Sequence, residues 1–152
     1  MRLFALAALA LAFAGCSLTD SGDSVAFRSL VSGAVQSPID FAILVEDLET
    51  ERVVRDLLSL PEPFDADYAT ETVVSVSTFG GCPDSRYGLE VVEVEADGPN
   101  VIIEAEVTAQ GTAGANVITY PYDVVAIPRL EGGVTLRVIG DPSQDCRSGS
   151  QD

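Results

Sequence analysis

Apolar and polar residues alternate along much of this chain, and the alternation predicts β-strands. In residues 101–108, Glu104 and Glu106 are out of phase with the apolar positions. Those apolar positions are Val101, Ile103, Ala105 and Val107. Residues 89–96 have a similar pattern and are connected to them by the turn-forming sequence Asp97-Gly98-Pro99-Asn100. The two segments therefore predict a β-hairpin with one solvated face.

Five further segments have the length and composition of strands and are bounded by glycine, proline and serine. They are residues 25–31, 39–45, 72–79, 122–127 and 134–139. Ser32-Gly33 and Ser37-Pro38 indicate turns after the first of these segments. In residues 72–79, valine alternates with serine, which places Val74 and Val76 on one face and Ser75 and Ser77 on the other.

One segment, residues 46–60, has the period of a helix. Its apolar residues recur about every 3.6 positions and are Leu48, Val53, Val54, Leu57 and Leu58. Pro61 and Pro63 end it. One helix among many short strands predicts a mainly β fold, namely an antiparallel β-sandwich or partly closed barrel of about seven strands with one short helix.

The N-terminal segment has the layout of a secretory signal peptide. Arg2 precedes an apolar run that ends at Phe13, and this run is shorter than the roughly 20 residues that span a bilayer. Phe-Ala-Gly-Cys, ending at Cys16, resembles the bacterial lipobox. The resemblance implies cleavage before Cys16, lipid attachment to Cys16 and, from Ser17, sorting to the outer membrane. An ordinary signal peptide with a chance cysteine is the alternative.

These features divide the chain into four parts. We expect a lipoprotein signal peptide at residues 1–15 and a lipidated cysteine with a flexible tether at residues 16–24. A single β-rich domain is expected at residues 25–147 and a disordered tail at residues 148–152. The domain is long enough for one hydrophobic core and too short for two.

The chain has three cysteines, an odd number for an exported protein. Lipidation of Cys16 would account for one. Cys82 and Cys146 lie in turn-like sequences and remain as a pair in a compartment where disulfides persist. We therefore predict a Cys82–Cys146 disulfide, and two free thiols are the alternative.

Charge and composition exclude several functions. The chain carries 24 acidic residues and 8 basic ones, which are all arginines, and its formal net charge is −16. This charge disfavours binding to nucleic acid or to anionic lipid, so the lipid anchor is expected to hold the protein at its membrane. Without histidine or lysine, the common nucleophilic triads, Schiff-base chemistry and histidine zinc sites are absent. We expect no enzymatic activity, no cofactor and no metal.

The densest acidic cluster is interpreted as a solvated loop. It consists of Glu62, Asp65, Asp67 and Glu71. The spacing matches no calcium-binding loop, and no glycine stands at the turn that such a loop requires. Paired carboxylates that cleave a glycosidic bond are an alternative, which the lack of a tryptophan to stack against a sugar disfavours.

The segment from Ile118 to Arg129 reads Ile-Thr-Tyr-Pro-Tyr-Asp-Val-Val-Ala-Ile-Pro-Arg. It resembles the C-terminal domain of the PrcB-like family of protease-complex subunits. A looser similarity in the order of elements, including Asp67-Tyr68 and a Gly80-Gly81 loop before Tyr87, extends the resemblance over residues 25–139. The chain differs by inserting Cys82 to Arg86 between those glycines and Tyr87. The resemblance implies a non-catalytic domain that binds or stabilises a partner, in the founding case a cell-surface protease.

Tyr87, Tyr120 and Tyr122 lie at predicted junctions between loops and strands. Tyrosine combines apolar area with a polar tip, so with Arg86 they are the candidates for partner binding. Burial in the core is the alternative, above all for Tyr122, which alternates in phase with Val124. We expect a lipid-anchored protein-interaction module of the cell envelope, with an exported protease as its partner. A protease inhibitor of β architecture and a lipoprotein that binds a small ligand or glycan are the alternatives.

Overall fold

The computed structural model describes residues 23–39, 42–78, 80–97, 100–110, 114–129, 135–139 and 146. For residues 97 and 135–139 it describes the backbone alone. The predicted signal peptide, Cys16, all but the last two residues of the predicted tether and the predicted tail lie outside the described residues. No helix in the described part is long and apolar enough to cross a membrane.

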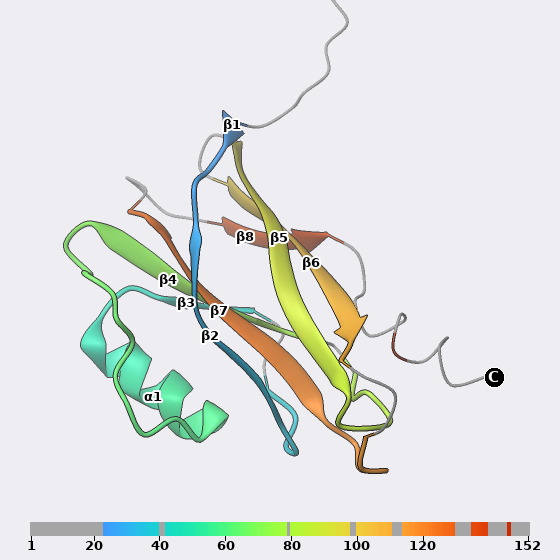
Figure 1. The fold of residues 1–152 in the computed structure, drawn as a ribbon. Coiled ribbons are helices and arrows are strands. Elements are labelled where there is room, and N and C mark those ends of the chain that lie inside the picture. Colours follow the sequence, from blue (N-terminus) through green and yellow to red (C-terminus); the bar gives the residue numbers. More distant parts are fainter. Residues whose placement is uncertain are drawn as a thin grey trace, which may run out of the picture.

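Eight strands in the described residues form two four-stranded sheets (Figure 1). The first sheet has the order β1 (Asp23–Ser24), β5 (Tyr87–Asp97), β6 (Asn100–Ala109) and β8 (Thr135–Ile139). The second has the order β2 (Arg28–Val35), β7 (Tyr120–Pro128), β4 (Glu71–Ser77) and β3 (Ala42–Val45). The predicted mainly β sandwich with one helix is confirmed, and the sheets do not close into a barrel. Among the described pairs, only β6 with β8 is parallel.

The core has two compartments because both faces of the second sheet are covered. Between the sheets lie apolar side chains of β4, β5, β6 and β7. Beyond the second sheet, α1 (Leu48–Leu58) and the segment after it cover the other face of β4 and β7. The serine face of β4 is therefore buried as well, and the Ser77 hydroxyl donates a hydrogen bond of 2.9 Å to the Pro121 carbonyl oxygen.

Asp47 and Ser59 cap α1, so the helix is shorter than residues 46–60. A carboxylate oxygen of Asp47 accepts a hydrogen bond of 2.8 Å from the Thr50 amide, and Ser59 has a left-handed backbone with φ of 58°. The predicted apolar face is only partly correct. Val54 and Leu58 are buried, whereas Leu48, Val53 and Leu57 are exposed. Leu48 has the largest exposed fraction, 72% of its surface.

Glu51 is buried in the core, although the apolar pattern of the helix predicted that its charged residues would lie outside the core. Its carboxylate accepts hydrogen bonds of 3.2 Å from the Phe64 amide and 2.8 Å from the Tyr68 hydroxyl. Arg55, one turn along the helix, forms an ion pair with it at 3.1 Å. Burial, and then the bond to Glu51, raise the pKa of Tyr68. Glu51 thus fastens the segment between α1 and β4 onto the helix.

The N-terminal strand begins earlier and runs further than predicted. Asp23 and Ser24, assigned to the flexible tether, pair with Ala96 and Glu95 in β5. The chain then crosses to the second sheet, where Ser32 and Gly33, predicted as a turn, lie inside β2. Their pairing with β7 overrides the local turn signal. Glycine is needed at Gly33 because a Cβ there would lie 2.7 Å from the Tyr122 hydroxyl oxygen.

The predicted hairpin of residues 89–96 and 101–108 is confirmed as β5 and β6, with the expected exposed acidic face on β6. The register shifts between Val91 and Glu93, which is a β-bulge that leaves Val92 exposed. Of the four acids interpreted as a solvated loop, Glu71 lies instead at the start of β4. There Arg28 pairs with it at 2.9 Å and holds the pKa of its carboxyl below the usual range.

Candidate functional site: the disulfide end of the sandwich

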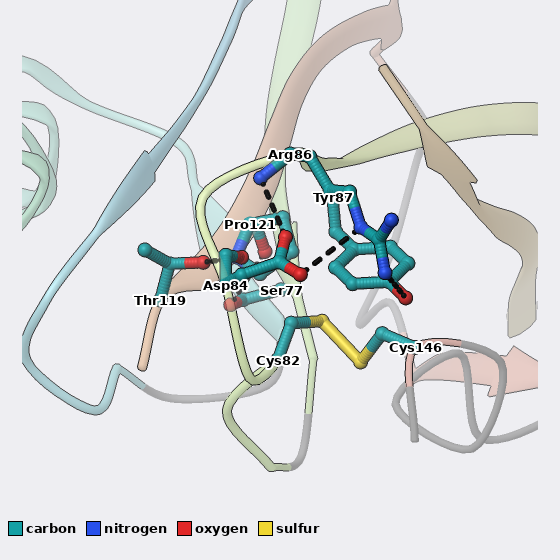
Figure 2. The surroundings of a disulfide bond; sticks show 8 residues. All are labelled: Ser77, Cys82, Asp84, Arg86, Tyr87, Thr119, Pro121 and Cys146. Carbon is teal, nitrogen blue, oxygen red and sulfur yellow. Dashed lines mark hydrogen bonds and ion pairs between the residues drawn. A yellow bond between two sulfur atoms is a disulfide. The ribbon is translucent and has the colours of Figure 1, made fainter. Parts of the chain in front are cut away.

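Two loops meet at one end of the sandwich, and we call their residues 80–86 and 114–120, together with Cys146, the disulfide end (Figure 2). Cys82 and Thr119 join the loops through two backbone hydrogen bonds, Cys82 N–H to Thr119 O at 2.7 Å and Thr119 N–H to Cys82 O at 3.0 Å. Ser85 and Ala115 exchange two further bonds of 3.1 and 2.9 Å. These hydrogen bonds therefore brace the two loops against each other, so that they form one structural unit.

The structure joins Cys82 to Cys146 in a disulfide, which supports the predicted pairing. Their Cα atoms are 5.4 Å apart although the residues are separated by 64 positions in the sequence. Both cysteines are buried against the Tyr87 ring. The bond thus attaches the C-terminal segment to the loop that follows β4.

Arg86 is held in place by its neighbours. Its guanidinium forms an ion pair with Asp84 at 3.0 Å and lies 5.2 Å from the centre of the Tyr87 ring, a cation–π arrangement visible in Figure 2. A carboxylate oxygen of Asp84 also accepts a hydrogen bond of 2.9 Å from the Arg86 amide. About a quarter of the Arg86 side chain remains accessible, at 27%. A preorganised, partly exposed guanidinium is well suited to bind a carboxylate or carbonyl group of a partner.

Of the three predicted tyrosines, only Tyr120 is partly exposed. Tyr122 has 4% of its surface exposed because it faces the compartment covered by α1, and burial raises its pKa. Tyr87 has 7% exposed because the disulfide packs against it. Tyr122 and Tyr87 are therefore core residues in this structure, which is the alternative considered for these tyrosines.

The most exposed apolar side chain of the disulfide end belongs to a residue that was not among the predicted site residues. Ile118 has 62% of its surface exposed, and its neighbour Val117 is exposed too. Gly81 lies directly beneath Ile118, since a Cβ at Gly81 would collide with the Ile118 side chain. The signal was available in the sequence: an apolar pair follows a glycine-rich segment and precedes the strand that begins at Tyr120.

Asp123 is a second residue that the sequence analysis did not single out. It is buried in the middle of β7, where its carboxylate accepts hydrogen bonds of 3.0 Å from the Val91 amide and 2.9 Å from the Ser29 hydroxyl. It thereby connects the two sheets at the β-bulge. An acid within an otherwise apolar strand was the available signal.

The fold is a β-sandwich of two sheets with one helix on its outer face. Residues 74–128 match the protein-family model described as PrcB C-terminal. The match runs from β4 to β7 and includes both loops of the disulfide end. It supports the resemblance seen in the sequence over a narrower range than residues 25–139. No curated protein and no solved structure matches the chain.

Proposed function

We propose that this chain is a non-catalytic, lipid-anchored protein-interaction module of the cell envelope that binds an exported protease or its complex through the disulfide end. The observation that carries the proposal is the match to the PrcB C-terminal family over residues 74–128, which contains both loops of this end. That family name suggests a role associated with a protease complex. The exported, lipid-anchored state rests on the sequence of residues 1–16.

The chemistry of the disulfide end is consistent with a protein partner. Ile118 and Val117 present apolar surface, and Tyr120 lies beside Gly81 together with Ile118. Arg86 belongs to the neighbouring loop, which is hydrogen-bonded to this one through Cys82 and Thr119. Protein interfaces commonly have an apolar centre with tyrosine and arginine as anchors. Because hydrogen bonds and the disulfide already order the loops, binding costs little conformational entropy.

Ile118→Ser is expected to weaken partner binding at least about tenfold, since it removes the apolar side chain with the largest exposed fraction at this end. The melting temperature of the Ile118→Ser variant should stay close to that of the unaltered protein, because the Ile118 side chain is mostly in solvent. The measurement is recovery of the partner from envelope extracts, followed by titration of the purified pair. Leu48→Ser, an exposed leucine on α1, is the matched control. Equal binding by both variants would move the interface away from the disulfide end.

The effect on a recovered protease separates assistance from inhibition. Longer protease lifetime or higher activity in the presence of the domain supports an assisting subunit. Suppressed turnover supports an inhibitor, a possibility that the exposed loop bearing Ile118 favours, because exposed loops on rigid scaffolds can block active-site clefts. Saturable binding of a glycan or another small ligand, with no protein recovered, would replace the proposal by ligand capture.

Cys16→Ser is expected to abolish metabolic labelling with palmitate and to release the protein from membranes. The reason is that a chain with a formal net charge of −16 has little electrostatic attraction to anionic lipid and depends on its acyl chains. Cell fractionation with and without labelled palmitate provides the measurement. Membrane association of the unaltered protein without any label would refute the lipid anchor and leave the interaction proposal standing.

A further inference from the structure

One edge of β5 lacks a strand partner over most of its length. β6 pairs with one side of β5 throughout, whereas β1 reaches only Glu95 and Ala96 on the other side. Among the described residues, no strand pairs with that second side from Tyr87 to Glu93. The Val91 amide points to this side, where Asp123 accepts its hydrogen. Because backbone groups alternate along a strand, the N–H and C=O groups of Tyr87 and Leu89 point the same way.

A groove runs beside this open edge. Its larger part has a volume of about 390 Å³ and is lined by residues 89–92 of β5, by Phe27, Ser29 and Ser32, and by Thr108, Gln110 and Asp123. A second cavity of about 170 Å³ shares Ser32 and Leu89 with it and continues towards the disulfide end. The groove arises because the N-terminal strand leaves the first sheet after β1 and joins the second as β2 (Figure 1). Six residues of β5, 87–92, border it, a length of roughly 20 Å.

The outer face beside this edge is acidic. Glu90 and Glu93 lie on β5, directly opposite Glu106 and Glu104 of β6. Like charges placed opposite one another destabilise a sheet, and a basic side chain lying alongside would relieve their repulsion. A second copy of the chain, with the same formal net charge of −16, would be repelled instead.

We propose that the open edge of β5 accepts one antiparallel strand from a partner protein, and that this strand is an extended segment of alternating basic and apolar residues. The basic side chains would lie beside Glu90 and Glu93, and the apolar ones would enter the groove beside Phe27 and Leu89. The inference rests on the proposed function, since the occupant is a segment of protein. It adds a second contact surface with its own recognition chemistry, because added strands bind through main-chain hydrogen bonds and pockets for alternate side chains.

The test uses a synthetic eight-residue peptide of alternating arginine and valine, titrated against the full chain, with a glutamate–valine peptide for comparison. We expect the arginine peptide to bind and the glutamate peptide to bind at least about tenfold more weakly. Glu90→Lys combined with Glu93→Lys should weaken the arginine peptide about tenfold. Asp56→Lys, an exposed charge reversal on α1, is the control and should change little. Equal affinity for the two peptides, or no binding at millimolar concentration, overturns the proposal.

Backbone methylation tests strand addition directly and does not depend on the folding of a variant. Residues opposite Leu89 in an antiparallel strand share its inward face and direct their N–H groups to β5. N-methylation of the valines should therefore abolish binding, whereas N-methylation of the arginines should leave it intact. Amide hydrogen exchange should slow at Tyr87 and Leu89. Methylation without effect in either position, or protection confined to residues 114–118, overturns the proposal.

The two proposals fail separately. If Ile118→Ser prevents recovery of a protein partner while the arginine peptide does not bind, the edge inference is wrong and the proposed function stands. If the peptide binds as described and no protein partner is recovered from envelope extracts, the edge inference stands and the proposed function is wrong.

Discussion

Replacing Cys82 and Cys146 together by alanine is expected to lower the free energy of unfolding by about 4 kcal/mol. The reason is that the disulfide joins residues separated by 64 positions, and the chain-entropy model assigns a cost of this order to opening such a loop. Urea denaturation followed by circular dichroism measures the change. Reduction of the unaltered protein should produce a similar loss.

The double alanine variant also supplies the control, because adding reductant to it should change nothing. A variant as stable as the oxidised protein would show that the bond does not constrain the unfolded chain. Non-reducing peptide mapping gives an independent check, and quantitative alkylation of both cysteines without reductant would refute the pairing itself.

Glu51→Ala is expected to cost about 3 kcal/mol of stability, within the range seen when one partner of a buried ion pair is removed. Glu51 is 2% exposed, and its loss leaves the Phe64 amide, the Tyr68 hydroxyl and Arg55 without their shared acceptor. Tyr68→Phe should cost about 1 kcal/mol, because it removes one hydrogen bond from the same network. Equilibrium unfolding in urea measures both values.

Arg52→Ala, an exposed change on the same helix, is the matched control and should stay within about 0.5 kcal/mol of the unaltered protein. If Glu51→Ala resembled this control, the carboxylate would not be holding the segment between α1 and β4. Faster proteolysis of that segment in Glu51→Ala would localise the effect.

Strand content and the β5–β6 hairpin could be predicted because their signals are local. The alternation in residues 101–108 and the short turn before it lie within a few residues of each other, and the structure has that hairpin. The boundaries of β2 could not be predicted in this way. Ser32 and Gly33 pair with Asp123 and Tyr122, about ninety positions away, and this long-range pairing overrides a turn signal. The parallel pairing of β8 with β6 likewise has no local signature.

The disulfide of the candidate site could be predicted by counting cysteines. The exposure of the candidate tyrosines could not be predicted, because it depends on which elements cover them. Three cysteines, one assigned to lipid, indicated the Cys82–Cys146 pair without any structure. Whether a tyrosine is exposed depends on what covers its strand. Tyr122 alternates in phase with Val124, and both are buried because α1 covers the face on which they lie. Ile118 is exposed for the opposite reason: it precedes β7, and the described residues leave 62% of its surface uncovered.

Strand β1 and the disulfide end lie at opposite ends of the domain. β1 pairs with β5 near Asp97 (Figure 1). Tyr87, ten positions away at the other end of β5, packs on the disulfide. A strand of that length separates the two ends by roughly 30 Å. Anything that holds the chain through residues preceding Asp23 would therefore aim Ile118 and Arg86 away from the attachment point. The long axis of the sandwich would act as a spacer that sets how far from the surface a partner is met.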